Sequence, residues 1–200
     1  RSGTNYCRLA FSPSGKIIAV GRVNGKIELW DLSSKSMLRE LSGHKKQIND
    51  LRFSPDGNLL ASASHDSSAR VWLPETGAEI ACLTIGPGWV SRAAFAPDNS
   101  CLATAHENGA VVLWSISATN IARAAIGPPS FPPGASALEF APDGGRLAIA
   151  DNSRALTIWN VKAGKIDSQF HLPLRATWVR FADRETRLWA LAAGGQMYLL

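Results

Sequence analysis

A serine, a histidine and an aspartate, the three residue types of a hydrolytic triad, recur close together in the second quarter of the chain. They are Ser64, His44 and Asp66. A serine nucleophile needs an exposed hydroxyl, an oxyanion hole and a histidine that is free to move protons. The residues around Ser64 do not form a Gly-x-Ser-x-Gly elbow, and Trp72 follows at a spacing that recurs elsewhere in the chain. We therefore expect these residues to have a structural role.

The remaining histidines and cysteines do not show the spacing of any other site. None of His65, His106 and His171 lies at a typical distance from a second zinc ligand, and we expect each in a turn or on the surface. The three cysteines are far apart and include no Cys-x-x-Cys pair, which indicates small buried side chains. Such cysteines fit residence in the cytoplasm. We expect no catalytic residue, no metal site and no cofactor.

Positive charge is concentrated at the beginning of the 200-residue chain. The formal net charge is +5, and residues 1–50 contain nine lysines or arginines against four acids, whereas residues 51–200 contain twelve of each. This excess indicates either a basic patch for an anionic partner or an ordinary solvated surface, and we favour the second interpretation. The longest apolar runs, such as Leu188–Ala193, are too short to span a membrane. We expect no membrane partner.

A short phrase that begins with phenylalanine recurs at nearly equal intervals along the whole chain. Its five copies begin at Phe11, Phe53, Phe95, Phe140 and Phe181, at intervals of 42, 42, 45 and 41 residues. The first four copies continue with a small residue, a proline and a pair typical of a tight turn, as in Ser54-Pro55-Asp56-Gly57. The chain is therefore built from a repeated unit.

A tryptophan keeps step with this phrase. Trp30, Trp72, Trp114 and Trp159 each follow the phenylalanine of their own copy by 19 residues, and the same step from Phe181 ends at Leu200. Length varies only outside this window, so we expect the window to be packed and the connection to be a surface loop.

Each window has the residue pattern of several short strands. In the second copy, the segments 48–53, 59–64, 69–73 and 78–83 have the length and alternation of strands, and turn residues separate them. No long helical period appears, which excludes parallel α/β folds. One unit of about 40 residues cannot bury both of its faces alone. Radial stacking solves this problem, so the sequence predicts an all-β propeller of four-stranded antiparallel blades.

Two dipeptides make the chain resemble the WD-repeat family of β-propeller proteins. Trp30-Asp31 is the signature dipeptide of that family, and Gly43-His44 matches its Gly-His pair, nine residues before Phe53. The resemblance covers the chain as repeats at about 5–46, 47–88, 89–133, 134–174 and 175–200. It implies four blades and most of a fifth, a partial ring from a longer chain whose propeller has seven or more blades. A ring of five blades is the alternative.

The resemblance also assigns a buried hydrogen-bonded network to the second repeat. Its members would be His44, Ser64, Asp66 and Trp72. Ser64 would accept the indole hydrogen of Trp72 and donate to His44, and Asp66 would accept from the other imidazole nitrogen. The other repeats lack this set, so we expect the second blade to be the stiffest and the others to depend on apolar packing.

In this family, peptides commonly bind the end of the propeller where the loop before each first strand meets the turns between second and third strands. At that end the spacing places a predicted partner-binding set, which consists of Trp89, Arg22, His65, His106, Lys45 and Lys46. Tryptophan is a frequent interface anchor, which favours Trp89 as the centre. Packing of Trp89 between two blades is equally compatible with the sequence.

The resemblance implies a non-catalytic scaffold that binds a protein or peptide partner. Two alternatives stay open. The basic first quarter could bind nucleic acid or another anionic ligand, although nucleic acid is the less favoured partner. The repeats could also be the accessory region of a larger signalling enzyme.

Overall fold

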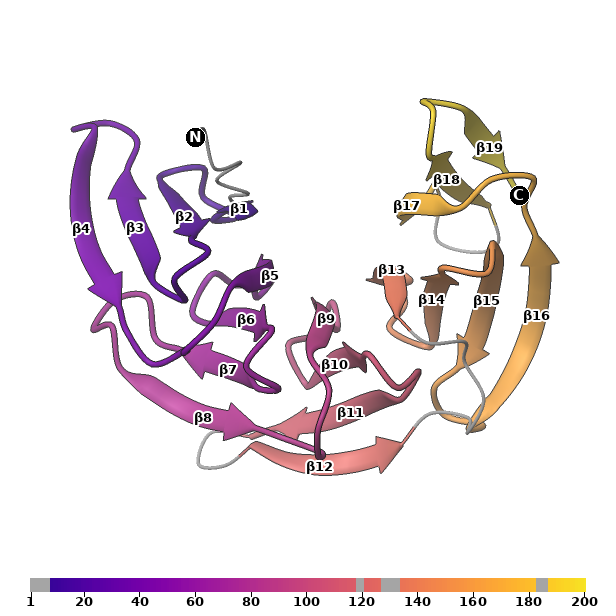
Figure 1. Ribbon diagram of the computed structural model, residues 1–200, viewed down its shortest axis with the longest axis horizontal. Helices are drawn as coiled ribbons and strands as arrows, with labels where there is room; N and C mark the ends of the chain where they lie inside the picture. Colours follow the sequence, from indigo (N-terminus) through magenta and orange to yellow (C-terminus); the bar gives the residue numbers. More distant parts are fainter. Residues whose placement is uncertain (1–7, 118–120, 127–133, 183–186) are drawn as a thin grey trace. The chain divides into compact units, whose positions relative to one another are not determined.

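The structure is a computed structural model that describes residues 8–117, 121–126, 134–182 and 187–200. Within these ranges the secondary structure consists of nineteen β-strands, and no helix is present. The strands form five sheets, and each sheet is made of strands that follow one another directly in sequence (Figure 1). The predicted all-β class is therefore confirmed.

The chain divides into two compact units, Arg1–Ala93 and Ala94–Leu200, and each is described by itself. The first unit contains two complete sheets. The first sheet consists of β1 (Arg8–Phe11), β2 (Ile17–Gly21), β3 (Ile27–Asp31) and β4 (Ser36–Leu41), in that order. The second consists of β5 (Ile48–Phe53), β6 (Leu60–Ser64), β7 (Ala69–Trp72) and β8 (Glu79–Leu83).

Three more sheets follow, and the boundary between the two units falls within the first strand of the third sheet. The third sheet consists of β9 (Val90–Phe95), β10 (Cys101–His106), β11 (Val111–Ile116) and β12 (Ile121–Ile126). The fourth consists of β13 (Ala135–Phe140), β14 (Arg146–Asp151), β15 (Ala155–Asn160) and β16 (Lys165–His171). The fifth has three strands, β17 (Ala176–Phe181), β18 (Leu188–Ala192) and β19 (Met197–Leu199). The predicted four-stranded antiparallel unit is confirmed in the first four sheets.

The repeated phrase forms the turn between the first and second strands of a sheet. In the second sheet, the amide of Gly57 donates to the carbonyl of Ser54 over 2.9 Å, and Gly57 has a φ of 78°. Asn99 has a φ of 61° in the third sheet and donates to the carbonyl of Ala96. Glycine and asparagine tolerate this left-handed conformation best, which explains why the phrase ends in one or the other.

The tryptophan of each repeat lies at the same place in its sheet. The paired residues are Trp30 with Ile18, Trp72 with Leu60, Trp114 with Leu102 and Trp159 with Leu147. The pairing with the fourth strand shifts register immediately before each of these tryptophans. Leu200 has the same place in the fifth sheet, because its amide and its carbonyl both bond to Leu188. Equal steps along the sequence therefore give equal positions in the sheets.

The apolar cores lie between successive sheets. In the first unit, Leu29 and Leu41 of the first sheet pack in one cluster with Leu60 and Trp72 of the second. In the second unit, one cluster joins the third sheet to the fourth, and another joins the fourth to the fifth. Each of these sheets covers the apolar face of a neighbour, which is the packing that a propeller requires.

Most of the predicted repeat anchors are buried. The buried ones are Trp72, Trp114, Trp159, Phe95, Phe140 and Phe181. Trp30 and Phe53 are half-buried. Phe11 is 62% exposed, so the expectation of a packed side chain is wrong at this position. Phe11 ends β1, and no sheet precedes β1 among the described residues.

Candidate functional site

The candidate site is built on the connection between β4 and β5, residues 42–47, which touches a turn in each of two neighbouring sheets. The amide of Ile48 donates to the carbonyl of Arg22, at the β2–β3 turn, over 3.1 Å. The amide of His65, in the β6–β7 turn, donates to the carbonyl of Gln47 over 2.9 Å. The loop before a first strand thus lies beside the turns between second and third strands, as the strand order predicts.

A glycine permits this close approach between loop and turn. Gly25, in the β2–β3 turn, has a φ of +86°, and a Cβ atom there would lie 2.4 Å from the carbonyl oxygen of His44. Both the backbone conformation and the space therefore require glycine.

The side chain of His44 is buried, and both of its ring nitrogens have hydrogen-bond partners. Nδ1 lies 2.9 Å from Asp66 Oδ2, and Nε2 lies 2.7 Å from Ser62 Oγ. Trp72 Nε1 donates to the same Ser62 Oγ over 2.8 Å. The single hydrogen of Ser62 is then available to Nε2, and the imidazole hydrogen lies on Nδ1, where it faces Asp66. This His44 network (His44, Ser62, Asp66 and Trp72) joins β6 and β7 to the β4–β5 loop.

The pKa shifts agree with this assignment of hydrogens. Burial lowers the pKa of His44, and the hydrogen bond to Asp66 opposes that effect only in part. For Asp66, burial raises the pKa, but hydrogen bonds from the Ser68 hydroxyl, the Lys45 amide and His44 outweigh it and bring the pKa to about 2. Near neutral pH, the network therefore holds a neutral imidazole against a carboxylate.

One predicted member of the network is wrong, because Ser62 and not Ser64 connects Trp72 to His44. Ser64 Oγ donates to the Lys46 carbonyl over 3.1 Å and accepts from the Asp66 amide over 3.1 Å. The reason is the strand register. Trp72 pairs with Leu60, and its indole reaches the side chain two residues further along the same face of β6. Ser64 lies about 7 Å beyond Ser62, out of reach of the indole.

The sequence Ser62, His44, Asp66 has the order of hydroxyl, imidazole and carboxylate in a hydrolytic triad. Ser62 is fully buried, however, and its oxygen already accepts the indole hydrogen of Trp72. A nucleophile must reach its substrate, so this serine has no catalytic use in the fold. A buried network with all members satisfied instead stiffens the backbone around it. Here it fixes the β4–β5 loop.

A second network, which the sequence analysis did not predict, lies in the third sheet. Trp114 Nε1 donates to Thr104 Oγ1 over 2.8 Å, and Thr104 Oγ1 lies 2.9 Å from His106 Nε2. Thr104 holds the place of Ser62, but the imidazole comes from two residues further along the same strand. Only 3% of His106 is exposed, and burial lowers its pKa to about 4. The prediction of His106 as a surface residue that binds a partner is therefore wrong, and the third sheet does not depend on apolar packing alone.

The other two tryptophans differ in how their indole nitrogen is satisfied. Trp30 Nε1 donates to Glu28 Oε2 over 3.0 Å. Trp159 Nε1 is buried and has no hydrogen-bond partner among the described residues. Ile149 stands in the fourth sheet where Ser62 and Thr104 stand in theirs, so the side chain at that place offers no acceptor.

Exposed side chains cover the β4–β5 loop and the neighbouring β8–β9 connection. Trp89 is 38% exposed, and its ring centroid lies 4.9 Å from that of His65, with the two rings tilted by 54°. Lys45 and Lys46 are exposed on the loop whose Gln47 carbonyl accepts from His65. We call these four side chains (Lys45, Lys46, His65 and Trp89) the His65–Trp89 surface. Four of the six predicted partner-binding residues thus belong to one contact-linked group.

Arg22, the sixth residue of the predicted set, is held by an acid on the neighbouring strand. Its Nε and Nη2 donate to the two oxygens of Glu28 over 3.0 and 2.7 Å. These hydrogen bonds lower the pKa of Glu28. The bidentate pair leaves Arg22 less available to a partner than Lys45 or Lys46.

The described cysteines are free thiols, and Cys7 lies outside the described residues. Cys82 is exposed, so the expectation of a buried side chain is wrong there; burial raises the pKa of Cys101 to about 11. In the part of the chain that the structure describes, no three His, Cys, Asp or Glu side chains are grouped so that they could hold a metal ion. Nor does that part contain a helix long and apolar enough to cross a membrane.

Two family models match the sequence. The model described as "WD domain, G-beta repeat" matches residues 35–72 and 80–115. The model described as "Anaphase-promoting complex subunit 4 WD40 domain" matches residues 2–48. Each match of the first model runs from the fourth strand of one sheet to the third strand of the next, from β4 to β7 and from β8 to β11.

A solved structure has the same fold. It is the β-propeller domain of Cps50 (Swd1) from Myceliophteria thermophila, with a TM-score of 0.81 and 22% sequence identity. The match covers 96% of this chain and 64% of that one. The chain thus spans a little less than two thirds of the length of that propeller chain, and the likeness identifies the fold as that of a β-propeller.

Proposed function

Because the chain belongs to the WD-repeat family of β-propeller proteins, we propose that it is a non-catalytic scaffold that binds a protein or peptide through the His65–Trp89 surface. Propeller domains of this family are generally protein-interaction scaffolds and are typically non-catalytic. The observation that carries the proposal for this chain is the exposed aromatic contact between Trp89 and His65.

The backbone beneath this surface is fixed before any partner arrives. The amide of Lys45 donates to Asp66 Oδ2 over 2.9 Å, which attaches the loop to the buried His44 network. The amide of His65 is held by the Gln47 carbonyl. A surface that is already ordered loses less conformational entropy on binding, and tryptophan supplies a large contact area with few rotatable bonds. Both features favour a binding role for Trp89.

The charge of the surface indicates an acidic partner. Lys45 and Lys46 are exposed, and no carboxylate of the described residues forms an ion pair with either. Charge complementarity raises association rates and selects partners more than it raises affinity. We therefore favour a peptide that places an apolar side chain on Trp89 and an acidic residue near the two lysines.

Binding of nucleic acid is the second candidate, since the first 50 residues carry the whole excess of positive charge. Part of that charge is already neutralised. Arg22 pairs with Glu28 at 2.7 Å, and Lys26 pairs with Glu40 at 2.8 Å. A salt series distinguishes the candidates, because each phosphate contact with B-DNA adds about −0.9 to the slope of log affinity against log salt. A shallow slope supports the peptide.

The experiment uses acidic peptides selected by display against the full 200-residue chain, with affinities measured by fluorescence polarisation. Truncation of a central anchor typically costs about 2 kcal/mol or more, so Trp89→Ala should weaken binding about 30-fold. The matched control is Trp178→Ala, because Trp178 is 39% exposed and lies in the other unit. Equal losses in the two variants, or none in Trp89→Ala, would contradict the proposal.

We also propose that the protein resides in the cytoplasm. Cys82 and Cys101 are unpaired thiols, and an exposed free thiol such as that of Cys82 persists best in a reducing compartment. Microscopy of a fluorescent fusion of the full-length protein tests this, and a signal confined to an oxidising compartment would contradict it.

A further inference from the structure

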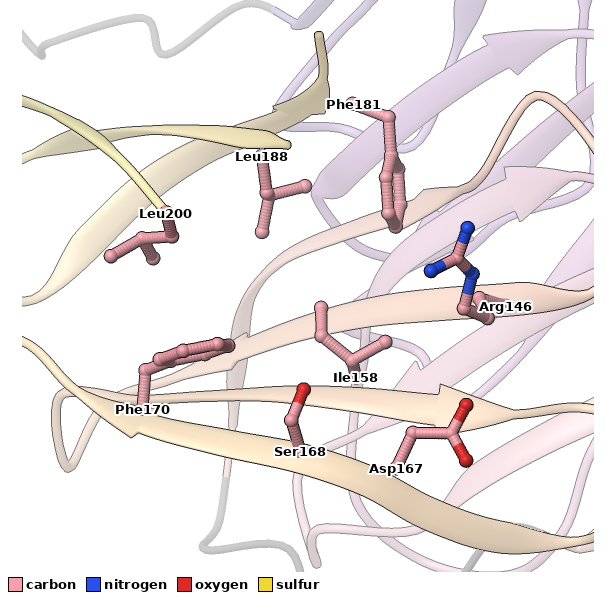
Figure 2. Close-up of a pocket in the computed structure, with 8 residues that line it drawn as sticks. All are labelled: Arg146, Ile158, Asp167, Ser168, Phe170, Phe181, Leu188 and Leu200. Carbon is pink, nitrogen blue, oxygen red and sulfur yellow. The ribbon is translucent and has the colours of Figure 1, made fainter. Parts of the chain in front are cut away.

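A leucine stands at the place of the repeated tryptophan in the fifth sheet, and a cavity lies beside it. Leu200 and Leu188 exchange two hydrogen bonds of 2.9 Å, at the place where Trp159 pairs with Leu147 in the fourth sheet. A cavity of about 240 Å³ opens next to this leucine, between the fourth and fifth sheets (Figure 2). Both sheets belong to the second unit.

The first unit shows what an indole does at this place. Leu41 pairs with Ile27 on β3, packs in one cluster with Trp72 and is 2% exposed. Phe170 pairs with Leu156 on β15 and thus holds the corresponding place opposite the fifth sheet. Phe170 is 37% exposed. An isobutyl group is smaller than an indole, so Leu200 leaves uncovered the apolar wall that a tryptophan covers in the first unit.

The walls of the cavity are apolar and partly aromatic. Phe170 and Ile158 form one side, and Phe181, Leu188 and Leu200 form the other (Figure 2). Transfer of an aromatic side chain from water into such surroundings is favourable, and ring–ring contacts add to the gain. The shape and lining therefore suit a flat apolar group.

Oxygen atoms lie at one edge of this apolar space. The Ser168 hydroxyl and the Asp167 carboxylate extend from β16 beside Phe170 and Ile158 (Figure 2). An indole has one N–H donor and an apolar body, which is the combination that such a cavity can satisfy. Elsewhere in this chain the indoles of Trp30, Trp72 and Trp114 each donate to a side-chain oxygen.

We propose that this cavity binds the tryptophan side chain of a partner peptide. The indole lies between Leu200 and Phe170, and its N–H donates to an oxygen of Ser168 or Asp167. The site lies in the second unit and shares no residue with the His65–Trp89 surface, so each proposal can fail without the other. A protein with both surfaces would engage two separate segments of a partner.

The test uses three blocked amino acids as probes, with the full chain labelled at its isoleucine and leucine methyl groups. In NMR titrations, N-acetyltryptophanamide should shift the methyl signals of Ile158, Leu188 and Leu200. N-acetylleucinamide should bind about tenfold more weakly, because it buries less apolar area. N-acetyl-1-methyltryptophanamide, which lacks the indole donor, should bind about fivefold more weakly. Equal affinities for the three probes, or shifts confined to other residues, would overturn the proposal.

Two tryptophan variants provide the matched comparison. Leu200→Trp places an indole in the cavity from within the chain, whereas Leu199→Trp adds the same group to a side chain that is 48% exposed. Binding of N-acetyltryptophanamide should be lost in Leu200→Trp and retained in Leu199→Trp. Retained binding in Leu200→Trp would overturn the proposal. If Leu200→Trp fails to fold, the methyl shifts of the unsubstituted chain decide the question.

Discussion

The hydroxyl of Ser62 joins the two buried ring systems of the His44 network, so its removal tests the network most sharply. Ser62→Ala leaves two buried atoms without a partner, Trp72 Nε1 and His44 Nε2. Each such loss costs about 1–3 kcal/mol. We expect a total of about 3 kcal/mol, in the lower part of the combined range, because the indole donor and the imidazole acceptor can move toward each other. The substitution removes too little volume to admit a water molecule.

The matched control for this change is Ser62→Thr. The third sheet uses Thr104 at the same place, where it also accepts from a tryptophan. Threonine keeps the hydroxyl, so Ser62→Thr should cost less than about 1 kcal/mol. Urea unfolding of the full chain measures both variants, and a lower midpoint with an unchanged slope reports lost stability. Equal midpoints for the alanine and threonine variants would refute the reasoning.

Three further predictions concern the turn at the site, the second network and the unsatisfied indole. Gly25→Ala should lower the free energy of unfolding by at least about 2 kcal/mol more than Gly15→Ala; both glycines have positive φ, but only Gly25 lies against backbone, and urea midpoints report the difference. The pKa of His106 is about 4 in the folded chain against 6.5 as its ordinary value, so the unfolded chain binds the proton first and stability should fall as pH decreases from 6.5 to 4, by up to about 3 kcal/mol. Unfolding of His106→Gln across this pH range should show a flatter profile, and an unchanged profile would contradict the assignment. Ile149→Thr supplies the acceptor that Trp159 lacks and should cost less than the same change at Ile158; a larger cost at Ile149 would show that the indole gains nothing from it.

The repeat and its strands could be predicted from the sequence because each spacing has a direct structural meaning. The step of 19 residues from Phe53 to Trp72 places the tryptophan opposite Leu60, and the same step places Leu200 opposite Leu188. The turn phrase was equally informative, since Gly57 and Asn99 both take the left-handed conformation.

The networks were harder to predict, because they depend on register within a hairpin and not on spacing along the chain. Ser62 and Ser64 share one face of β6, and only the pairing of Trp72 with Leu60 decides which hydroxyl the indole reaches. The third sheet solves the same problem with Thr104 and His106 from one strand, and a family pattern that places the histidine in a loop could not reveal it. A threonine two residues before a histidine on a predicted strand was the available signal.

The exposure of the predicted partner-binding residues could not be predicted from spacing. His106 and Trp89 occupy loop or strand-end positions of similar type, yet one is buried and the other is exposed. The difference lies in the side-chain contacts, since Thr104 holds the imidazole inside its sheet, whereas Trp89 contacts His65 in a neighbouring turn.

The indole signals of the seven tryptophans provide the most direct test of the binding surface. In ¹⁵N-resolved NMR spectra of the full chain, addition of a selected acidic peptide should shift the indole signal of Trp89, which Trp89→Ala assigns by its loss. The indole signals of buried Trp72 and Trp114 should stay in place. A peptide that binds without moving the Trp89 signal would contradict the account.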